Sequence, residues 1–329
     1  MLTLAIETSC DETAAAVIKG SNTVLSSCVS SSIHMHKKFG GIVPEIASRF
    51  HLEYISPVVQ EAVSKAKVRL DDIGLVAATY APGLVGSLLV GLSFAKALSL
   101  GINKPFIGVN HINAHLFSPF ILEKKFSFPF IGLVVSGGHT SLAYVRDFDK
   151  IKVIGNTLDD AAGEAYDKVA KMIGLPYPGG PQIDKLASSI ESSPFKLKCA
   201  KLENSFDFSF SGIKTDVLYT WGKTKIKNKK TKTQLAHAFQ KEVVEIVTSK
   251  SIAACRKYKL NILSVGGGVA CNSFLRKRLS EECKKAGIRL LIANPHLCLD
   301  NAAMIGIVGY SLYKKGKRSP YDLGASASS

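Results

Sequence analysis

The stretch LTLAIETSCDETAAAVI, residues 2–18, consists of two apolar runs on either side of a polar segment. Runs of this length bounded by turn-forming residues are typical of β-strands, so Leu2–Glu7 and Thr13–Ile18 are predicted to form a hairpin. The same arrangement returns at residues 130–145, where two apolar runs flank Ser136–His139. Two hairpins are therefore expected, one in each half of the chain.

Each predicted hairpin is followed along the chain by a buried strand, a glycine-containing turn and a helix. The first such unit occupies residues 73–98 and the second occupies residues 260–279, whose turn contains Gly266–Gly268. A hairpin followed by a strand, a turn and a helix, present twice in the same order, indicates an internally duplicated α/β protein. We expect two like lobes with a ligand cleft between them.

The chain of 329 residues is longer than one domain of average size, which favours two lobes. We expect an N-terminal lobe at residues 1–108, completed by a C-terminal helix near residues 303–318. Residues 109–302 are predicted to form the C-terminal lobe and to carry both a metal site and a nucleotide site. Apolar residues make up 46% and charged residues 21%, a composition that excludes a disordered or fibrous chain.

The most apolar stretch, Leu84–Ile102, contains Lys96 and several serines and glycines, so no membrane-spanning segment is predicted. The sequence also lacks the pattern of a secretory signal, and we expect a cytoplasmic protein with no membrane partner. The seven cysteines are scattered and form no C-x-x-C pair. This argues against a disulfide framework and against a cysteine zinc site.

Positive charge is concentrated in the second half of the sequence. Residues 1–150 contain 13 Lys and Arg against 11 Asp and Glu, whereas residues 151–329 contain 29 against 15. A positive field of this size attracts polyanions, among which nucleic acid is the commonest partner. Charge alone leaves a second interpretation open, in which the lysines, including six at 223–232, only keep the surface solvated.

The glycine-containing turns are suited to bind phosphate. A glycine turn at the carboxyl end of a strand lets backbone N–H groups approach an anion, and the following helix directs its positive end to the same place. Gly266–Gly268 is such a turn, although simple chain reversal would need the same glycines. The pattern G-x-x-x-x-G-K-[ST] is absent from the sequence, which excludes a P-loop fold.

His111 and His115 are four residues apart, so on a helix both imidazoles would lie on one face. This spacing suits a divalent metal, and Asp300 is the candidate for a third ligand. Position 112 is isoleucine, so the glutamate that acts as general base in the metalloprotease pattern H-E-x-x-H is missing. The spacing by itself leaves open that both histidines only cap the helix or pack in the core.

Residues 158–170 begin with acidic residues, as does a helix whose dipole favours them at its N-terminus. Asp167 in this helix could accept both hydroxyls of a ribose, whereas Asp159 and Asp160 are interpreted as capping and solvated residues. Prolines on both sides of Gly179–Gly180 predict a stiff turn next to the cleft. A purely structural corner is the alternative.

Eight sequence blocks, distributed along almost the whole chain, together resemble one known family. The blocks are IETSCDET (6–13), HKKFGGIVPEIASRFH (36–51), PGLVGSLLVG (82–91), HINAH (111–115), VSGGHT (135–140), DFSFSGIKT (207–215), GGGVACN (266–272) and DNAAMI (300–305). On these blocks the chain is similar to the TsaD family, the bacterial tRNA N6-adenosine threonylcarbamoyltransferases once described as O-sialoglycoprotein endopeptidases.

The resemblance implies two actin-like ATPase lobes of the ASKHA, RNase H-like class, in agreement with the duplication. It also implies one divalent metal ion, most often Fe2+ and sometimes Zn2+, bound by His111, His115 and Asp300. The nucleotide part of the substrate is then expected to contact Val134, Val135, Ser136, Gly137, Gly138, Asp167, Gly180, Asp184 and Asn272. Asp11 is a candidate for assisting proton removal from the attacking amine.

The activity implied by the resemblance is transfer of a threonylcarbamoyl group from threonylcarbamoyl-adenylate to N6 of an adenosine in tRNA, with release of AMP. That adenosine lies 3′ of the anticodon in tRNAs that read codons beginning with adenine. TsaB and TsaE are the expected protein partners. Two alternatives come from other classes: a metal-dependent glycoprotein endopeptidase, and a non-catalytic nucleotide-binding scaffold of the same fold.

Two positions depart from the family pattern. The family commonly has Gly where Ala81 stands and Thr where Leu299 stands. The extra methyl group of Ala81 is expected only to narrow a turn. Leu299 removes a hydroxyl group beside the proposed ligand Asp300 and is expected to affect how that carboxylate is oriented.

Overall fold

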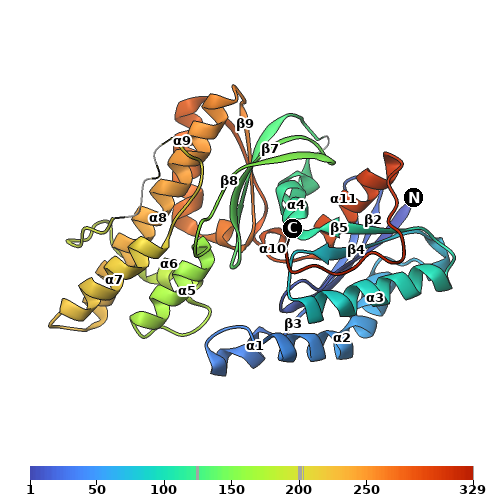
Figure 1. Cartoon of the computed structure of the whole chain (residues 1–329), viewed down its shortest axis with the longest axis horizontal. Helices are drawn as coiled ribbons and strands as arrows, with labels where there is room; N and C mark the ends of the chain where they lie inside the picture. The colour runs from blue at the N-terminus through green and yellow to red at the C-terminus, as the bar shows by residue number, and fades with distance from the viewer. Residues whose placement is uncertain (124–125, 199–201, 203, 329) are drawn as a thin grey trace. The chain divides into compact units, whose positions relative to one another are not determined.

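The computed structural model describes residues 1–123, 126–198, 202 and 204–328, and it consists of two compact units. Unit 1 comprises Met1–Phe126 together with Leu299–Ser329, and unit 2 comprises Ser127–Cys298. Figure 1 shows both units with most of their helices and strands labelled. None of the helices within the described residues is long and apolar enough to cross a lipid bilayer.

Unit 1 is built on a five-stranded mixed sheet in the order β3-β2-β1-β4-β5. Strands β1 and β2 form the first predicted hairpin, with Leu4 opposite Val17, and β1 is parallel to β4, which is parallel to β5. The strands are β1 (Leu2–Glu7), β2 (Glu12–Lys19), β3 (Thr23–Ser31), β4 (Ile73–Ala81) and β5 (Phe106–Asn110).

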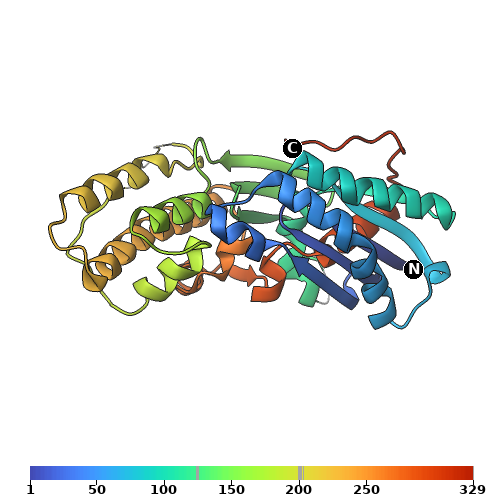
Figure 2. The same ribbon diagram turned by 90° about the horizontal axis from the view of Figure 1, so that it is seen from below.

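Helices cover both faces of this sheet, which explains why its central strands are mostly apolar and almost completely buried. Leu4 and Ile6 of β1 pack in one cluster with residues of α2 and α3. Ala5 faces the other side, where α11 packs; Figure 2 shows helices on both sides of the sheet. The helices of unit 1 are α1 (Ile33–His36), η1 (Lys37–Phe39), α2 (Pro44–Lys65), η2 (Leu70–Asp72), α3 (Val85–Gly101), α4 (His111–Phe117), η3 (Ser118–Leu122) and α11 (Ala302–Lys314).

Unit 2 repeats the topology of unit 1. Its sheet has the order β10-β9-β6-β7-β8, in which β6 and β7 form the second predicted hairpin and β6, β9 and β10 are parallel. The hairpin strands and the following parallel strands therefore occupy the same relative positions in both sheets, and the predicted internal duplication is confirmed. The strands are β6 (Phe130–Val135), β7 (Thr140–Asp147), β8 (Lys150–Asn156), β9 (Ile262–Gly266) and β10 (Arg289–Ile292).

The longest helix of unit 2 is α8, which packs against α6 and α9. The side chains on one face of α8 are mostly buried. The lysine-rich run at 223–232 spans the end of α7, a short connection and the first turn of α8. The helices are α5 (Ala162–Met172), α6 (Gly179–Ala187), α7 (Ser211–Lys223), α8 (Lys229–Lys257), η4 (Gly268–Cys271), α9 (Ser273–Ala286) and α10 (Pro295–Cys298).

The division into units differs from the predicted lobes at 1–108 and 109–302. Helix α4 follows β5 without a break and contacts α11, which in turn packs on the sheet of unit 1. Residues 109–126 and 299–302 therefore lie in unit 1. As a result, the candidate metal ligands lie in unit 1, whereas the candidate nucleotide-binding residues lie in unit 2.

Candidate functional site

Helix α4 presents His111 and His115 on one face because the two residues are one helical turn apart. Asp300 immediately precedes α11 and reaches the same place from a different part of the chain. One ligand atom from each of the three side chains lies within 4.8 Å of the other two. The structure thus brings together the three residues proposed from the sequence as metal ligands.

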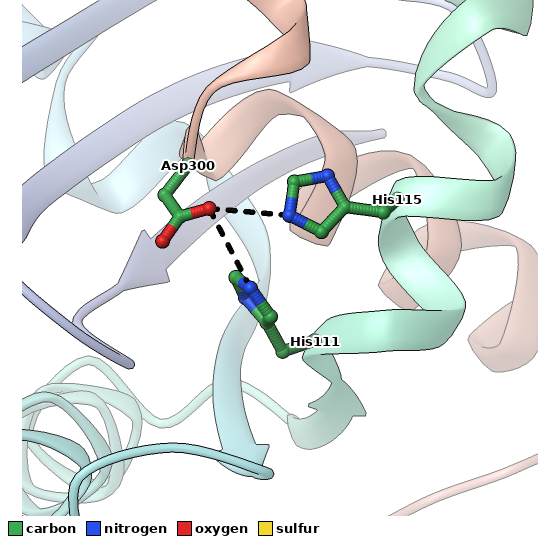
Figure 3. A group of neighbouring side chains, drawn as sticks. All are labelled: His111, His115 and Asp300. Carbon is green, nitrogen blue, oxygen red and sulfur yellow. Dashed lines mark hydrogen bonds and ion pairs between the residues drawn. The ribbon is translucent and has the colours of Figure 1, made fainter. Parts of the chain in front are cut away.

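Figure 3 shows both imidazoles directed at the same carboxylate. Asp300 Oδ1 lies 3.1 Å from His115 Nε2 and 3.5 Å from His111 Nε2. Ligands bound tetrahedrally at about 2.1 Å from a zinc-like ion are separated by about 3.4 Å. The spacing of these atoms therefore fits a shared metal ion, and two imidazoles with one carboxylate are a donor set that suits Fe2+ or Zn2+. Leu299, the residue that departs from the family pattern, does not turn Asp300 away.

The Nδ1 atom of His115 is a buried polar atom without a hydrogen-bond partner among the described residues. The ring of this histidine is fully buried. A buried polar nitrogen without a partner costs free energy. The other ring nitrogen of His115, Nε2, faces Asp300. A histidine that binds a ligand through Nε2 would be kept in the protein despite this loss of free energy.

Glu7 holds the ring of His111 from behind. Its Oε2 accepts a hydrogen bond from His111 Nδ1 at 2.9 Å and another from Thr79 Oγ1 at 2.5 Å, and its Oε1 accepts from the backbone N–H of Ser9 at 2.5 Å. Glu7 is completely buried at the end of β1. A carboxylate on one ring nitrogen turns the other nitrogen toward the ligand position. Sequence reasoning missed this residue, although a glutamate ending an apolar strand was the available signal.

Charge in this cluster is balanced by a proton when no metal ion is bound. Burial disfavours the charged form of His111, but attraction to Glu7 and Asp300 and the Glu7 hydrogen bond outweigh it and raise its pKa to about 9. Burial lowers the pKa of His115. Burial tends to raise the pKa of Glu7, yet the charge and hydrogen bond of His111 hold it below its usual value. The cluster therefore has one cationic imidazole at neutral pH.

Asp11, the candidate for proton removal, lies in the turn between β1 and β2, and its residue is mostly buried. Its carboxylate is hydrogen-bonded to the side chain of Glu12. Burial, together with the negative charges of Asp300 and Asp11, raises the pKa of Glu12 to about 10. Glu12 is therefore protonated at neutral pH. The sequence did not reveal this pairing.

These shifts predict a stability that falls with rising pH in the metal-free protein. The pKa of His111 is raised from 6.5 to about 9, so its stabilisation is complete below pH 6.5 and is lost as the pH rises through 9. The raised pKa of Glu12 acts in the same direction between 4.5 and about 10. Thermal unfolding in the presence of a chelator should therefore give a falling Tm from pH 7 to 10. Glu12→Gln should flatten the slope, and a Tm that rises over this range would contradict the assignment.

In unit 2 the predicted phosphate turn connects β6 and β7. Val134 and Val135 end β6, and the backbone N–H of Ser136 donates to the carbonyl of His139 at 2.8 Å. No described residue accepts a hydrogen bond from the backbone N–H groups of Gly137 or Gly138. A Cβ atom at either glycine would meet no atom within 4 Å. Two adjacent amides that have no acceptor among the described residues are thus available to an anion.

The carboxyl end of β9 lies beside this turn, because β6 and β9 are parallel and Val134 is opposite Gly266. Gly267 has φ of 93°, and a Cβ atom there would lie 2.4 Å from the carbonyl oxygen of Val135. Gly163 at the start of α5 is equally close, since its Cβ atom would lie 2.6 Å from the carbonyl oxygen of Ser136. Both glycines therefore permit close backbone approaches that shape the turn.

Three side chains predicted to contact the nucleotide, those of Asp167, Asp184 and Asn272, also bind the backbone at helix N-termini. Asp167 Oδ1 accepts a hydrogen bond from the backbone N–H of Gly179 at 2.6 Å, and Gly180 also donates to this carboxylate, whose pKa burial raises. Asp184 accepts from the backbone N–H of Ser273 at 3.0 Å and from its hydroxyl at 2.9 Å.

Asn272 is bound on both sides of its amide. Its Nδ2 donates to Gln240 Oε1 at 2.7 Å, and its Oδ1 accepts from the backbone N–H of Leu275 at 2.9 Å. The residues predicted from the sequence thus gather at the starts of α6 and α9 and at the ends of β6 and β9. Their positions agree with one site, but their side chains also have structural roles that the sequence did not predict.

Comparison with known proteins adds an independent finding. Residues 23–307 match the TsaD family, described as tRNA N6-adenosine threonylcarbamoyltransferase. A Clostridium botulinum protein of that name is 51% identical over 324 residues, which cover 98% of this chain and 95% of the relative.

Two solved structures of low sequence identity are similar in fold. Full-length HypF in a phosphate- and nucleotide-bound form matches with a TM-score of 0.63 and 16% identity, over 100% of this chain and 56% of that chain. The ROK hexokinase of Thermus thermophilus matches with a TM-score of 0.53 and 14% identity, over 96% of this chain and 99% of that chain. The expected fold of two α/β lobes is therefore shared with these structures.

Proposed function

The chain belongs to the TsaD family of tRNA N6-adenosine threonylcarbamoyltransferases, and on this basis we propose the reaction in detail. The acceptor is N6 of the adenosine 3′ of the anticodon in tRNAs that read codons beginning with adenine. The donor is threonylcarbamoyl-adenylate, and AMP is released. The observation that carries this proposal is the cluster of His111, His115 and Asp300 in a chain that is half identical to a named transferase over nearly its whole length.

We propose one divalent metal ion as cofactor, with Fe2+ as the first choice and Zn2+ as the second. The residues that would hold it are His111 and His115 through Nε2 and Asp300 through its carboxylate, with Glu7 orienting His111. When bound, such an ion supplies Lewis acidity toward the carbonyl group of the donor.

The chain's own groups have three roles in this proposal. The backbone N–H groups of Gly137 and Gly138 bind the phosphate of the adenylate and stabilise the AMP that leaves with the electron pair of the broken C–O bond. Asp167 accepts hydrogen bonds from the ribose hydroxyl groups in addition to those from the backbone of Gly179 and Gly180. The amine nitrogen forms the new C–N bond to the carbamoyl carbon, and Asp11 accepts the proton that the nitrogen loses.

Neither alternative from the sequence is retained as a second function. The endopeptidase has no counterpart to the glutamate of H-E-x-x-H, because Ile112 occupies that position. The non-catalytic scaffold would not need three metal-binding side chains within 4.8 Å of one another. We propose TsaB and TsaE as partners and the cytoplasm as the location, both from the family resemblance.

The proposed function is tested with tRNA nucleosides. Purified protein is incubated with TsaB, TsaE, threonylcarbamoyl-adenylate and unmodified tRNA, and the nucleosides are analysed by mass spectrometry. We expect N6-threonylcarbamoyladenosine to form with tRNAs that read codons beginning with adenine and not with other tRNAs. If the adenosine at that position stays unmodified after incubation of metal-bound protein with all of these components, the proposal is wrong.

Replacing Glu7 should weaken metal binding without removing a ligand. Outer partners of metal-binding histidines typically contribute about 10- to 100-fold in affinity, so Glu7→Ala should lose Zn2+ affinity in that range. Glu7→Gln keeps an oxygen near His111 Nδ1 and should lose less. Titration against a chromophoric chelator measures the affinity, with the exposed Glu61→Gln as control. Wild-type affinity in Glu7→Ala would show that Glu7 has no such role.

A further inference from the structure

We propose that the end of α7 and the start of α8 form the surface on which the tRNA backbone docks. This lysine surface consists of Lys223, Lys225, Lys227, Lys229, Lys230 and Lys232, together with the apolar side chains of Leu218, Tyr219 and Ile226. The proposal rests on the proposed function, which supplies tRNA as substrate, and it assigns the binding of that substrate to one part of unit 2.

Charge is the first observation. Residues 211–232 contain seven lysines and one acidic residue, Asp216, which accepts a hydrogen bond from the backbone N–H of Lys198. Lys214 pairs with Asp160 at 2.5 Å. Within the described part of the chain, none of the six lysines at 223–232 forms an ion pair. Unit 2 as a whole has 27 Lys and Arg against 15 Asp and Glu, so its remaining surface does not neutralise them.

The lysines at the start of α8 do not stabilise this helix. Lys229 and Lys230 occupy the first turn of this helix, which contains no acidic residue. The N-terminal end of a helix carries partial positive charge, so cations there destabilise the helix and anions stabilise it. Asn228 and Thr231 form a capping box, in which the side chain of each residue accepts a hydrogen bond from the backbone N–H of the other. In the isolated protein, no acidic residue in the first turn of α8 offsets the repulsion between its lysines and the positive end of the helix. A bound polyanion would offset this repulsion.

Exposed apolar side chains are the second observation. Tyr219 is 64% exposed, Ile226 is 65% exposed and Leu218 is 50% exposed. Trp221 lies next to them, with Lys227 Nζ 5.3 Å from the centre of its ring. Aromatic side chains interleaved with lysines are typical of surfaces that stack on unpaired bases while neutralising phosphates. An RNA with unpaired loops has both chemical features, whereas an acidic protein segment would match only the charge.

Salt dependence gives the sharpest test. We compare wild-type protein with Lys225→Glu/Lys227→Glu/Lys229→Glu/Lys230→Glu, using fluorescence anisotropy with unmodified tRNA transcript at several KCl concentrations. Each phosphate contact contributes about 0.7 to 0.9 to the slope of log affinity against log salt, so the slope should fall by roughly 3. At physiological salt the affinity should fall by at least about tenfold.

The matched control changes the same net charge on other exposed parts of unit 2, in the variant Lys259→Glu/Lys277→Glu/Lys284→Glu/Lys285→Glu. It should retain most of the wild-type slope and affinity. Glutamates at positions 229 and 230 suit the N-terminus of a helix, so the test variant should unfold at the wild-type temperature or above it. A loss of binding in this variant therefore cannot be attributed to unfolding.

Tyr219 provides a readout that does not depend on charge. Tyr219→Ala should weaken tRNA binding several-fold, in line with about 1–3 kcal/mol per stacked base, while the salt slope stays unchanged. Tyr219→Phe keeps the ring and should retain wild-type affinity. Equal affinities in all three proteins would remove stacking from the proposal.

Two outcomes overturn the inference. If the test and control variants lose the same affinity, binding depends only on net charge and not on this surface. If the test variant binds tRNA normally but no longer binds an acidic protein partner, the surface serves that partner. Either result leaves the proposed function intact when wild-type protein modifies tRNA, whereas absence of modification by the wild type would contradict the function itself.

Discussion

A His111→Ala variant is expected to lose the tightly bound metal ion and, with it, threonylcarbamoyl transfer. Changing an outer partner of a metal ligand already costs roughly 10- to 100-fold in affinity, so removing a ligand should cost more. Metal content by mass spectrometry and nucleoside formation at saturating donor measure the two effects. His296→Ala, an exposed histidine in unit 2, should leave both unchanged.

The His111 variant also leaves Glu7 buried without its cationic partner. Removing one member of a buried ion pair costs about 3–5 kcal/mol, so the single variant should also be destabilised. Combining it with Glu7→Gln removes the unpaired charge and should restore stability without restoring the metal. A double variant that folds normally and still holds one metal ion per chain would show that His111 is not a ligand.

The substitution Gly267→Ala is expected to destabilise unit 2 strongly. The residue has φ of 93°, which alanine adopts only with strain, and the new Cβ atom would lie 2.4 Å from the carbonyl oxygen of Val135. Strain and displacement of β6 together should lower the free energy of unfolding by about 2–4 kcal/mol. Urea unfolding measures this loss.

Substitutions at two other glycines separate the effect of backbone strain from the effect of the steric contact. Gly287 has φ of 67° but open space around its Cβ position, so Gly287→Ala should show only the backbone strain, about 1 kcal/mol. Gly137 has neither constraint, and Gly137→Ala should keep full stability while it hinders the approach of phosphate to the turn. If Gly267→Ala and Gly287→Ala are equally stable, the contact between residue 267 and the carbonyl oxygen of Val135 does not contribute to the loss.

The residues that lie near one another in the sequence were predicted correctly. Both hairpins, both strand–turn–helix units and the common face of His111 and His115 depend on spacing within a few residues. Such spacing is read directly from the period of a strand or a helix. The position of Asn272 at the start of α9 follows the same local rules, whereas its bond to Gln240 and the bond of Asp167 to Gly179 do not.

The sequence by itself determined the duplicated α/β pattern, the family and the two histidines, because local periodicity and short motifs carry that information. Only the tertiary structure decided that α4 and α11 belong to unit 1, that Asp300 meets His115 from 185 residues away, and that Glu7 forms a hydrogen bond with His111. These contacts depend on how α11 packs on the sheet and on which strand ends share an edge. Packing of this kind follows from the shape and burial of the whole unit, which no short segment encodes.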